Sequence, residues 1–409
     1  MMMVCCILLG LILLGSLVGV TLHFCYFWLQ WPDIAGFVDD KKCPACYGIE
    51  LCPEFYAGDV VFYKDFQSTL SNYVNAKNVY SAKYNKAGGS VVVKKLGQDW
   101  ELKSLDTKAC QMFGSGSDCN FDNLTKIDLW DDIIRMVEYY GRHGNAYQTG
   151  LTLCPTTDGI FELLKPYEVN NTHGEKILLA NVWSILSINA EPILLKYLNA
   201  DSPKWPVPQY YGACGRATVQ QDCGLMLSTF LSEPWLYRAQ LAINLLEMAS
   251  VFTFNHTRFR FYLTDITSDN IVLKNWGKNK NIPMMVDLEN VIVLDKESTV
   301  FPEDTWPQNH RSEVIECSGC FAFSTEDICR HHLSDHNYYS ICKLLKDEVL
   351  AEVPQFVLQK SPDFPQILRE CVAPSRGQAD RFAAAQALDT ELKNILKIFV
   401  TDKPDSNDV

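Results

Sequence analysis

The pattern of apolar and polar positions along the chain changes period several times and predicts a mixed α+β fold. Apolar residues recur at helical spacing over 235–254, which predicts a long, mostly buried helix there. Shorter helical patterns cover 129–140 and 177–186. Two β-rich runs, 78–84 and 91–96, are joined by a glycine-containing turn and predict a hairpin.

The N-terminal pattern is different, because it is continuously apolar. From Val4 to Trp31 the only side chain that can carry charge is His23. This stretch exceeds the roughly 20 apolar residues that cross a bilayer, and aromatic residues gather at its end, as expected at a membrane interface. A cleaved signal peptide is the alternative, although its apolar core is normally about 7–15 residues. We expect an uncleaved anchor within residues 1–31.

Composition narrows the class of protein. The 409 residues are 47% hydrophobic and 21% charged, which is typical of a globular chain. The net charge of −13 argues against nucleic acid as a partner, because neutralising phosphates requires clustered Lys and Arg.

Cysteine usage indicates an oxidising compartment. Of 16 cysteines, Cys5, Cys6 and Cys25 lie in the apolar segment and leave 13 beyond it, several at short spacings. This density favours disulfides, and the odd number requires one thiol that is free or paired between chains. Three glycosylation sequons are compatible with a lumenal location; they begin at Asn123, Asn170 and Asn255.

Structural zinc is the alternative for the two C-x-x-C runs. Cys43 and Cys46 form one such pair, and Cys317 and Cys320 form the other. Either pair would supply two thiolate ligands, but neither is followed by a clean second pair.

Two short runs carry the clearest candidate chemistry. An apolar run leads to Asp265, four residues intervene, Asn270 follows, and a further apolar run leads to Asp287. This order is typical of a protein-kinase catalytic centre. In such a centre the first Asp accepts the proton of the attacking hydroxyl, while the Asn and the second Asp hold metal ions. The spacing therefore predicts Asp265 as the base and Asn270 and Asp287 as metal ligands.

Two upstream residues complete this pattern. Lys94 ends a Val-Val-Val-Lys run that matches the kinase strand whose Lys binds the α- and β-phosphates. Glu191 precedes a Pro-rich turn and a Tyr-Tyr-Gly strand, so it is the candidate partner of Lys94. Because Pro192 would remove a hydrogen bond inside a helix, Glu191 is expected at a helix start.

The pattern also departs from an ordinary kinase. No G-x-G-x-x-G precedes Lys94, and the catalytic loop reads Leu263-Thr264-Asp265 instead of His-Arg-Asp. Glu289 stands where Asp-Phe-Gly has its glycine, and its carboxylate could bind a second hard cation. The histidines near 331–336 are expected to be surface or core residues.

Taken in order, these motifs resemble the divergent protein kinase domain (FAM69-type) family of the secretory pathway, particularly its type 2, or deleted-in-autism, members. The resemblance rests on Lys42–Gly48, Val93–Gly97, Glu191-Pro192, Tyr211–Arg216, Tyr262–Asn270, Val286–Val291 and Asp335–Tyr339. It implies a kinase-like fold, a location in the endoplasmic reticulum or Golgi lumen or secretion, and disulfides in the N-terminal segment.

The resemblance also implies roles for the candidate residues. Lys94 and Glu191 would orient ATP, and Asp265 would be the catalytic base. Asn270, Asp287 and Glu289 would bind Mg²⁺ or Mn²⁺.

The expected architecture is α+β: a two-lobed protein-kinase-like fold with an N-terminal membrane segment and a Cys-rich collar. The predicted segments are an anchor or signal segment at 1–31, the collar at 32–75, an N-lobe at 76–230 with an insertion at 97–175, a C-lobe at 231–400, and a polar tail at 401–409.

Three functions are compatible with these expectations. The first is phosphate transfer from ATP to a protein or glycan hydroxyl. The second is a pseudokinase that acts as a lumenal or secreted signalling or scaffold protein with an unknown partner or receptor, which the missing glycine loop and altered motifs suggest. The third is a membrane-tethered structural protein without a nucleotide site.

Overall fold

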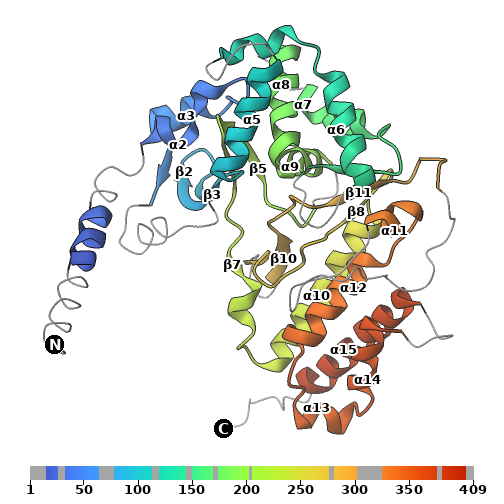
Figure 1. The fold of residues 1–409 in the computed structure, drawn as a ribbon. Helices are drawn as coiled ribbons and strands as arrows, with labels where there is room; N and C mark the ends of the chain where they lie inside the picture. Colours follow the sequence, from blue (N-terminus) through green and yellow to red (C-terminus); the bar gives the residue numbers. More distant parts are fainter. Residues whose placement is uncertain are drawn as a thin grey trace, which may run out of the picture.

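The computed structural model shows a mixed α/β lobe stacked on a helical lobe (Figure 1). It describes residues 15–25, 33–63, 78–112, 119–143, 150–168, 174–201, 205–275, 281–301, 325–374 and 380–401.

The first lobe is built on a five-stranded antiparallel sheet. Its strand order is β1-β2-β3-β6-β5. The strands are β1 (Val60–Phe62), β2 (Val79–Tyr84), β3 (Gly89–Lys95), β5 (Tyr210–Cys214) and β6 (Ala217–Gln221).

Alternation of side chains gives this sheet two different faces. The alternate residues Val91 and Val93 of β3 are fully buried, and they pack in one apolar cluster with the short helices α2 (Ile34–Val38) and α3 (Cys52–Ala57). Because neighbouring side chains of a strand point to opposite faces, Lys94 points away from this cluster and toward the second lobe.

The predicted insertion is part of the main core. Its helices, together with α8 and α9, contribute buried side chains to the same large apolar cluster as the second lobe. Its strand β4 pairs in parallel with β11, which lies after Asp287 in the chain. The elements are α5 (Asp99–Met112), η2 (Phe121–Lys126), α6 (Trp130–His143), β4 (Thr152–Cys154), α7 (Ile160–Glu168), α8 (Glu175–Ile188) and α9 (Glu191–Ala200).

The second lobe surrounds helix α10 (Trp235–Phe254), whose bounds are those that the apolar period predicts. Helices α12 and α15 pack against it (Figure 1). The loops between short strands beside it carry Asp265, Asn270, Asp287 and Glu289. The elements are β7 (Leu225–Met226), η3 (Leu227–Phe230), β8 (Phe259–Tyr262), β9 (Ile271–Asn275), β10 (Asn281–Met285), β11 (Ile292–Asp295), α11 (Thr325–Arg330), α12 (His336–Leu344), η4 (Leu345–Val349), α13 (Gln355–Lys360), α14 (Phe364–Val372) and α15 (Arg381–Thr401).

The segment predicted as a separate collar belongs to the first lobe. Its strand β1 is the edge strand that pairs with β2, and Cys52 is disulfide-bonded to Cys214 of β5. The boundary expected near residue 75 therefore falls inside the sheet, between its first two strands.

The described chain contains both short-range and long-range disulfides. They join Cys43–Cys46, Cys52–Cys214, Cys110–Cys119, Cys154–Cys329 and Cys342–Cys371. The Sγ atoms of Cys43 and Cys46 are bonded to each other, which argues against the zinc alternative there. Cys317 and Cys320, the second zinc candidate, lie outside the described residues. Cys223 is buried and is not part of a disulfide.

The expected membrane segment is described only in part. Residues Gly15–Cys25 form an exposed apolar helix, while 1–14 and 26–32 lie outside the described residues. Among the residues that the structure describes, no single helix is long and apolar enough to cross a membrane, and the bent pair α8 and α9 passes by length and composition only. Both of these helices are largely buried in the protein core.

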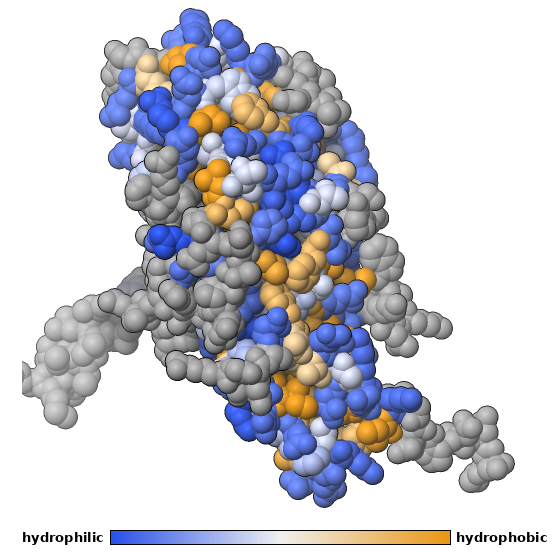
Figure 2. Space-filling model, turned by 90° about the vertical axis from the view of Figure 1, so that its right-hand side faces the viewer, coloured by the Kyte–Doolittle hydropathy of each residue, from blue (hydrophilic) through white to orange (hydrophobic). Residues whose placement is uncertain are grey.

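Polar residues dominate the surface shown in Figure 2, and apolar residues on this face gather in a band down its middle. The polar remainder of this face is what is expected when the large apolar cluster between the elements forms the core.

Candidate functional site

The site is centred on an ion pair between strand β3 of the sheet and helix α9. Lys94 of β3 donates to both carboxylate oxygens of Glu191, at 2.8 and 2.9 Å. Its Nζ also donates to the carbonyl of Val286, at 2.8 Å, which lies one residue before Asp287. Lys94 thus links the sheet, helix α9 and the strand that leads to Asp287.

Glu191 is fixed by the start of its helix. As predicted, it is the first residue of α9, with a proline in the first turn. The side-chain oxygen of Asn189 accepts a hydrogen bond from the Glu191 backbone N–H, at 2.8 Å, and so satisfies one of the donors left open at a helix start.

The pair is buried, with side-chain exposures of 11% for Lys94 and 3% for Glu191. Burial opposes the charge on Lys94, but the carboxylates of Glu191 and Asp287 outweigh it and raise the pKa of the ammonium. Burial also raises the pKa of Glu191, and the ammonium of Lys94 opposes that rise. Gln220 fits between them when its amide nitrogen faces Glu191 and its oxygen faces Lys94, each at 3.2 Å.

Asp265 and Asn270 meet across the loop that separates β8 from β9. The Asn270 amide donates to a carboxylate oxygen of Asp265, at 2.8 Å, and the Asp265 side chain is exposed. The backbone carbonyl of Asn270 accepts from the N–H of Val286, at 3.0 Å. This backbone contact brings the loop beside the segment that carries Asp287.

Glu289 adds a further carboxylate next to Asp287. It accepts a hydrogen bond from the Asn189 amide, at 2.8 Å, while its N–H donates to Asp287, at 3.2 Å. Burial, together with the charges of Asp287 and Glu191, raises the pKa of Glu289 to about 7.

Helix α12 supports the loop that contains Asp265. The N–H of Leu263 donates to the side-chain oxygen of Asn337, at 2.9 Å, and the Leu263 carbonyl lies 2.8 Å from Nε2 of His336. The Asn337 amide also donates to Phe261 and Thr253. His336 and Asn337 are fully buried, so they position the loop from the core.

A small apolar cluster lies beside the connection between the lobes. It contains the buried residues Cys223, Val272 and Met284, with the partly buried Ile282 and Val286 against it. Val272 and Met284 are cross-strand partners in β9 and β10. An apolar platform next to Lys94 and Asp287 is suited to a flat heteroaromatic ring.

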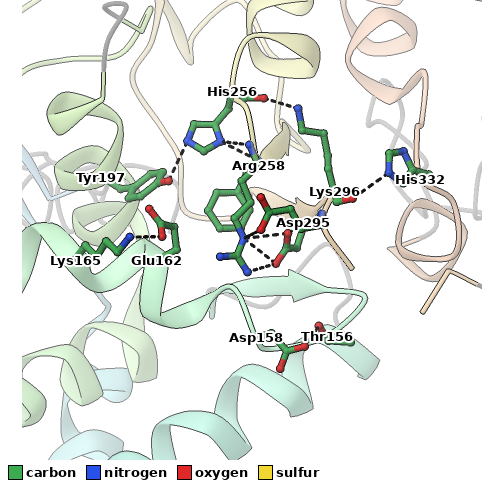
Figure 3. Close-up of polar contacts among 12 residues, drawn as sticks. Thr156, Asp158, Glu162, Lys165, Tyr197, His256, Arg258, Asp295, Lys296 and His332 are labelled. Carbon is green, nitrogen blue, oxygen red and sulfur yellow. Dashed lines mark hydrogen bonds and ion pairs between the residues drawn. The ribbon is translucent and has the colours of Figure 1, made fainter. Parts of the chain in front are cut away.

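A polar cluster behind the site connects α9 to β8 and β11 (Figure 3). Nδ1 of His256 accepts from two backbone N–H groups, so the proton sits on Nε2, which donates to the Tyr197 hydroxyl at 2.9 Å. Burial lowers the pKa of His256. Arg258 pairs with Asp295 of β11, at 2.7 Å. The cluster fixes the far end of the helix that begins at Glu191.

The donors present fit hard metal ions. Asn270 and Asp287 offer amide and carboxylate oxygens, which suit Mg²⁺ or Mn²⁺ when phosphate oxygens complete the shell. In the described part of the chain, no three His, Cys, Asp or Glu side chains are grouped to hold a metal by themselves.

All six predicted residues thus lie around one junction, but the sequence did not reveal the residues that support them. Asn189, Asn337 and Gln220 have no motif of their own. The sequence predicts His336 as a surface or core residue. The structure places it in the core, where its contact with the Leu263 carbonyl also positions the loop.

The sheet has a further strand, β1, upstream of the hairpin before Lys94 in which a glycine loop was expected. The connection between the first two strands of the sheet covers residues 64–77, which lie outside the described residues. Its sequence contains no glycine. In kinases a Gly-rich loop covers the phosphates.

The sheet order, the Lys94–Glu191 pair and the loop from Asp265 to Asp287 define a protein-kinase-like domain. A family model described as the protein-kinase domain of FAM69 matches residues 182–374. That range includes Glu191 and the whole segment from Asp265 to Glu289.

Relatives match over most of the chain. "Divergent protein kinase domain 2A" of Homo sapiens is 30% identical over 380 residues, which are 86% of this chain and 86% of the relative. The Xenopus tropicalis protein of the same name is 30% identical over 379 residues, with the same coverage of both chains. "Divergent protein kinase domain 2B" of Homo sapiens is 23% identical over 377 residues, 88% of this chain and 83% of the relative. The chain therefore belongs to the divergent protein kinase domain family.

Proposed function

We propose that this chain binds ATP with Mg²⁺ or Mn²⁺ and transfers phosphate to a protein hydroxyl in the secretory pathway. The observation that carries the proposal is the Lys94–Glu191 pair, at 2.8 Å, with Lys94 also bound to the carbonyl before Asp287. In protein kinases this pair and the metal-binding Asp must both be in place for transfer.

Each candidate residue has a defined task in this proposal. Lys94 would hold the α- and β-phosphates, and Glu191 would keep Lys94 oriented. Asn270 and Asp287 would hold the metal ion, which neutralises charge on the phosphates. The exposed carboxylate of Asp265 would accept the proton as the acceptor oxygen attacks phosphorus and the bond to the leaving ADP breaks.

Disulfides support a lumenal or secreted location. Cys154–Cys329 and Cys52–Cys214 join residues far apart in the sequence, and such bonds persist in oxidising compartments. We extend the proposal to endoplasmic reticulum or Golgi residence, with residues 1–31 as membrane anchor or signal segment.

The test begins with nucleotide binding. Thermal shift of the purified chain with ATP and either metal ion should show stabilisation, about 2.7 kcal/mol when free ATP is near 100 times its dissociation constant. Lys94→Met and Asp287→Asn should abolish the shift. If ATP produces no shift with either ion, the proposal is wrong.

Transfer is then measured with radiolabelled ATP and secreted proteins as acceptors. Asp265→Asn should lower the rate by about 10² to 10⁴-fold and leave the ATP shift unchanged. Asp269→Asn is the matched control, because Asp269 is an exposed carboxylate in the same loop and is bound to Ser228.

A pseudokinase is the second candidate, and Glu289 favours it. Its carboxylate stands beside Asp287 and adds negative charge where the nucleotide phosphates would lie. A chain that binds ATP but transfers no phosphate in any variant would support this candidate. In that case the wild type would incorporate no phosphate into any acceptor. If Lys94→Met also lost partner binding, the bound nucleotide would serve to hold the partner-binding conformation.

A further inference from the structure

A pocket lies between the insertion helices and shares no lining residue with the candidate catalytic site. Its volume is about 540 Å³, and its walls come from α5, α6 and the end of α8. This volume is within the roughly 300–1,000 Å³ of small-ligand pockets. An ordinary kinase lacks this insertion, so the pocket is not needed to build the kinase fold.

Two aromatic rings line this pocket from opposite helices. Trp100 of α5 is 70% exposed and Tyr139 of α6 is 54% exposed. Single exposed aromatics are common, but two that line one pocket mark a place where a ligand can cover them. Buried Leu105 and partly buried Met136 line the same pocket and add apolar surface.

The charged side chains of the pocket balance one another. Glu101 and Asp132 carry negative charge, and Lys108 and Arg135 carry positive charge. Arg135 donates to Asp132, at 2.9 Å, and Asp132 also accepts from the indole of Trp183, at 3.2 Å. The pocket therefore has no net charge to select an anion or a cation, but it presents hydrogen-bond donors and acceptors.

Hydroxyl groups complete this polar lining. Ser104 is exposed on α5, and Ser187 lies on α8 with its hydroxyl donating to the carbonyl of Trp183, at 2.8 Å. A hydroxyl that donates to the protein can still accept a hydrogen bond from a ligand.

We propose that this pocket binds a neutral saccharide. A pyranose ring has an apolar C–H face and a rim of hydroxyl groups. The C–H face would pack on Trp100 or Tyr139, and the hydroxyls would bond to Asp132, Arg135 and the serines. Charge-assisted bonds from a carboxylate and a guanidinium are stronger than neutral ones and fit alternating hydroxyls.

The same features argue against other ligands. A nucleotide or sulfated glycan would require a net positive pocket, and this one is neutral. An extended peptide is usually held on a strand edge or in a long apolar groove, whereas this pocket is walled by helices. The inference is independent of phosphate transfer, because binding is tested without nucleotide.

Saturation-transfer difference NMR on the purified full chain tests the proposal, with N-acetylglucosamine, galactose, mannose and xylose as probes. At least one sugar should receive magnetisation. Trp100→Ala and Tyr139→Ala should each weaken binding by about tenfold, the loss expected for one stacked ring. Both rings are exposed, so the variants should keep the melting temperature of the wild type.

Phe161→Ala is the matched control, because Phe161 is 54% exposed on α7 and does not line the pocket. It should bind sugar as the wild type does. The proposal is overturned if no sugar binds, or if both pocket variants bind as tightly as the control. It is also overturned if a neutral peptide such as Gly-Ser-Gly binds with Trp100 dependence and the sugars do not.

Discussion

Changing Glu191 to Gln tests whether the Lys94–Glu191 pair is the electrostatic centre of the site. Glutamine has the same shape but no charge. The variant leaves Lys94 protonated and buried, with the carbonyl of Val286 and the charge of Asp287 as its remaining favourable contacts. The folded protein should therefore lose stability.

The size of this loss follows from burial. The two side chains are only 11% and 3% exposed, so neither charge is well solvated. Removing one partner of a buried pair costs about 3–5 kcal/mol, and Lys94 keeps other contacts, so we expect about 3 kcal/mol. Lys94→Met should cost a similar amount, because it leaves Glu191 buried beside Asp287 and Glu289.

A double-mutant cycle separates the pair from other effects. The double variant Lys94→Met/Glu191→Gln leaves neither charge unpaired, so its loss should be smaller than the sum of the single losses by about 2–3 kcal/mol. Urea unfolding under oxidising conditions, without nucleotide, measures all four proteins. Additive losses, or single losses below about 1 kcal/mol, would refute the reasoning.

Three further predictions concern the surroundings of the pair. Without metal, Glu289→Gln should raise the melting temperature at pH 8 but not at pH 4. The pKa of Glu289 is raised to about 7 in the folded protein, so stability is lost as the pH rises toward 7 and the buried carboxyl ionises. Equal shifts of the melting temperature at both pH values would contradict this. Asn337→Ala should lower the free energy of unfolding by about 3 kcal/mol in urea, because it leaves the Leu263 N–H and two other buried groups without their hydrogen-bond partner. A loss near zero would show that Asn337 does not position the loop. Replacing Cys154 and Cys329 by serine should cost up to about 5 kcal/mol, since this disulfide closes a separation of 175 residues, and unchanged unfolding would show that the bond is dispensable.

Local patterns predicted much of this fold correctly. The apolar period over Trp235–Phe254 gave the bounds of α10, and the Gly-containing turn marked the hairpin of β2 and β3. Pro192 located the start of α9, because proline is tolerated best in the first turn of a helix. These features depend on neighbouring residues, which a single sequence displays.

Pairings between distant strands could not be predicted in the same way. The three-residue strands β1 and β4 are too short to show a period, and both are completed by partners elsewhere in the chain. For this reason the sequence pattern assigns Val60–Phe62 to a collar, although these residues form the edge strand of the sheet. The parallel pairing of β4 with β11 likewise makes the insertion part of the core.

The catalytic loop shows how a divergent motif can keep its geometry. Thr264 donates to the carbonyl of Asn290, at 2.6 Å, and Leu263 is held through its backbone by α12. Because backbone groups make the contacts at Leu263, replacing the usual residue there need not move Asp265. The altered loop sequence is therefore weak evidence against phosphate transfer. Glu289 is the stronger evidence, since its carboxylate changes the charge beside Asp287 itself. A decision between kinase and pseudokinase accordingly depends on whether Glu289 shares a metal ion with Asp287 or repels the phosphates.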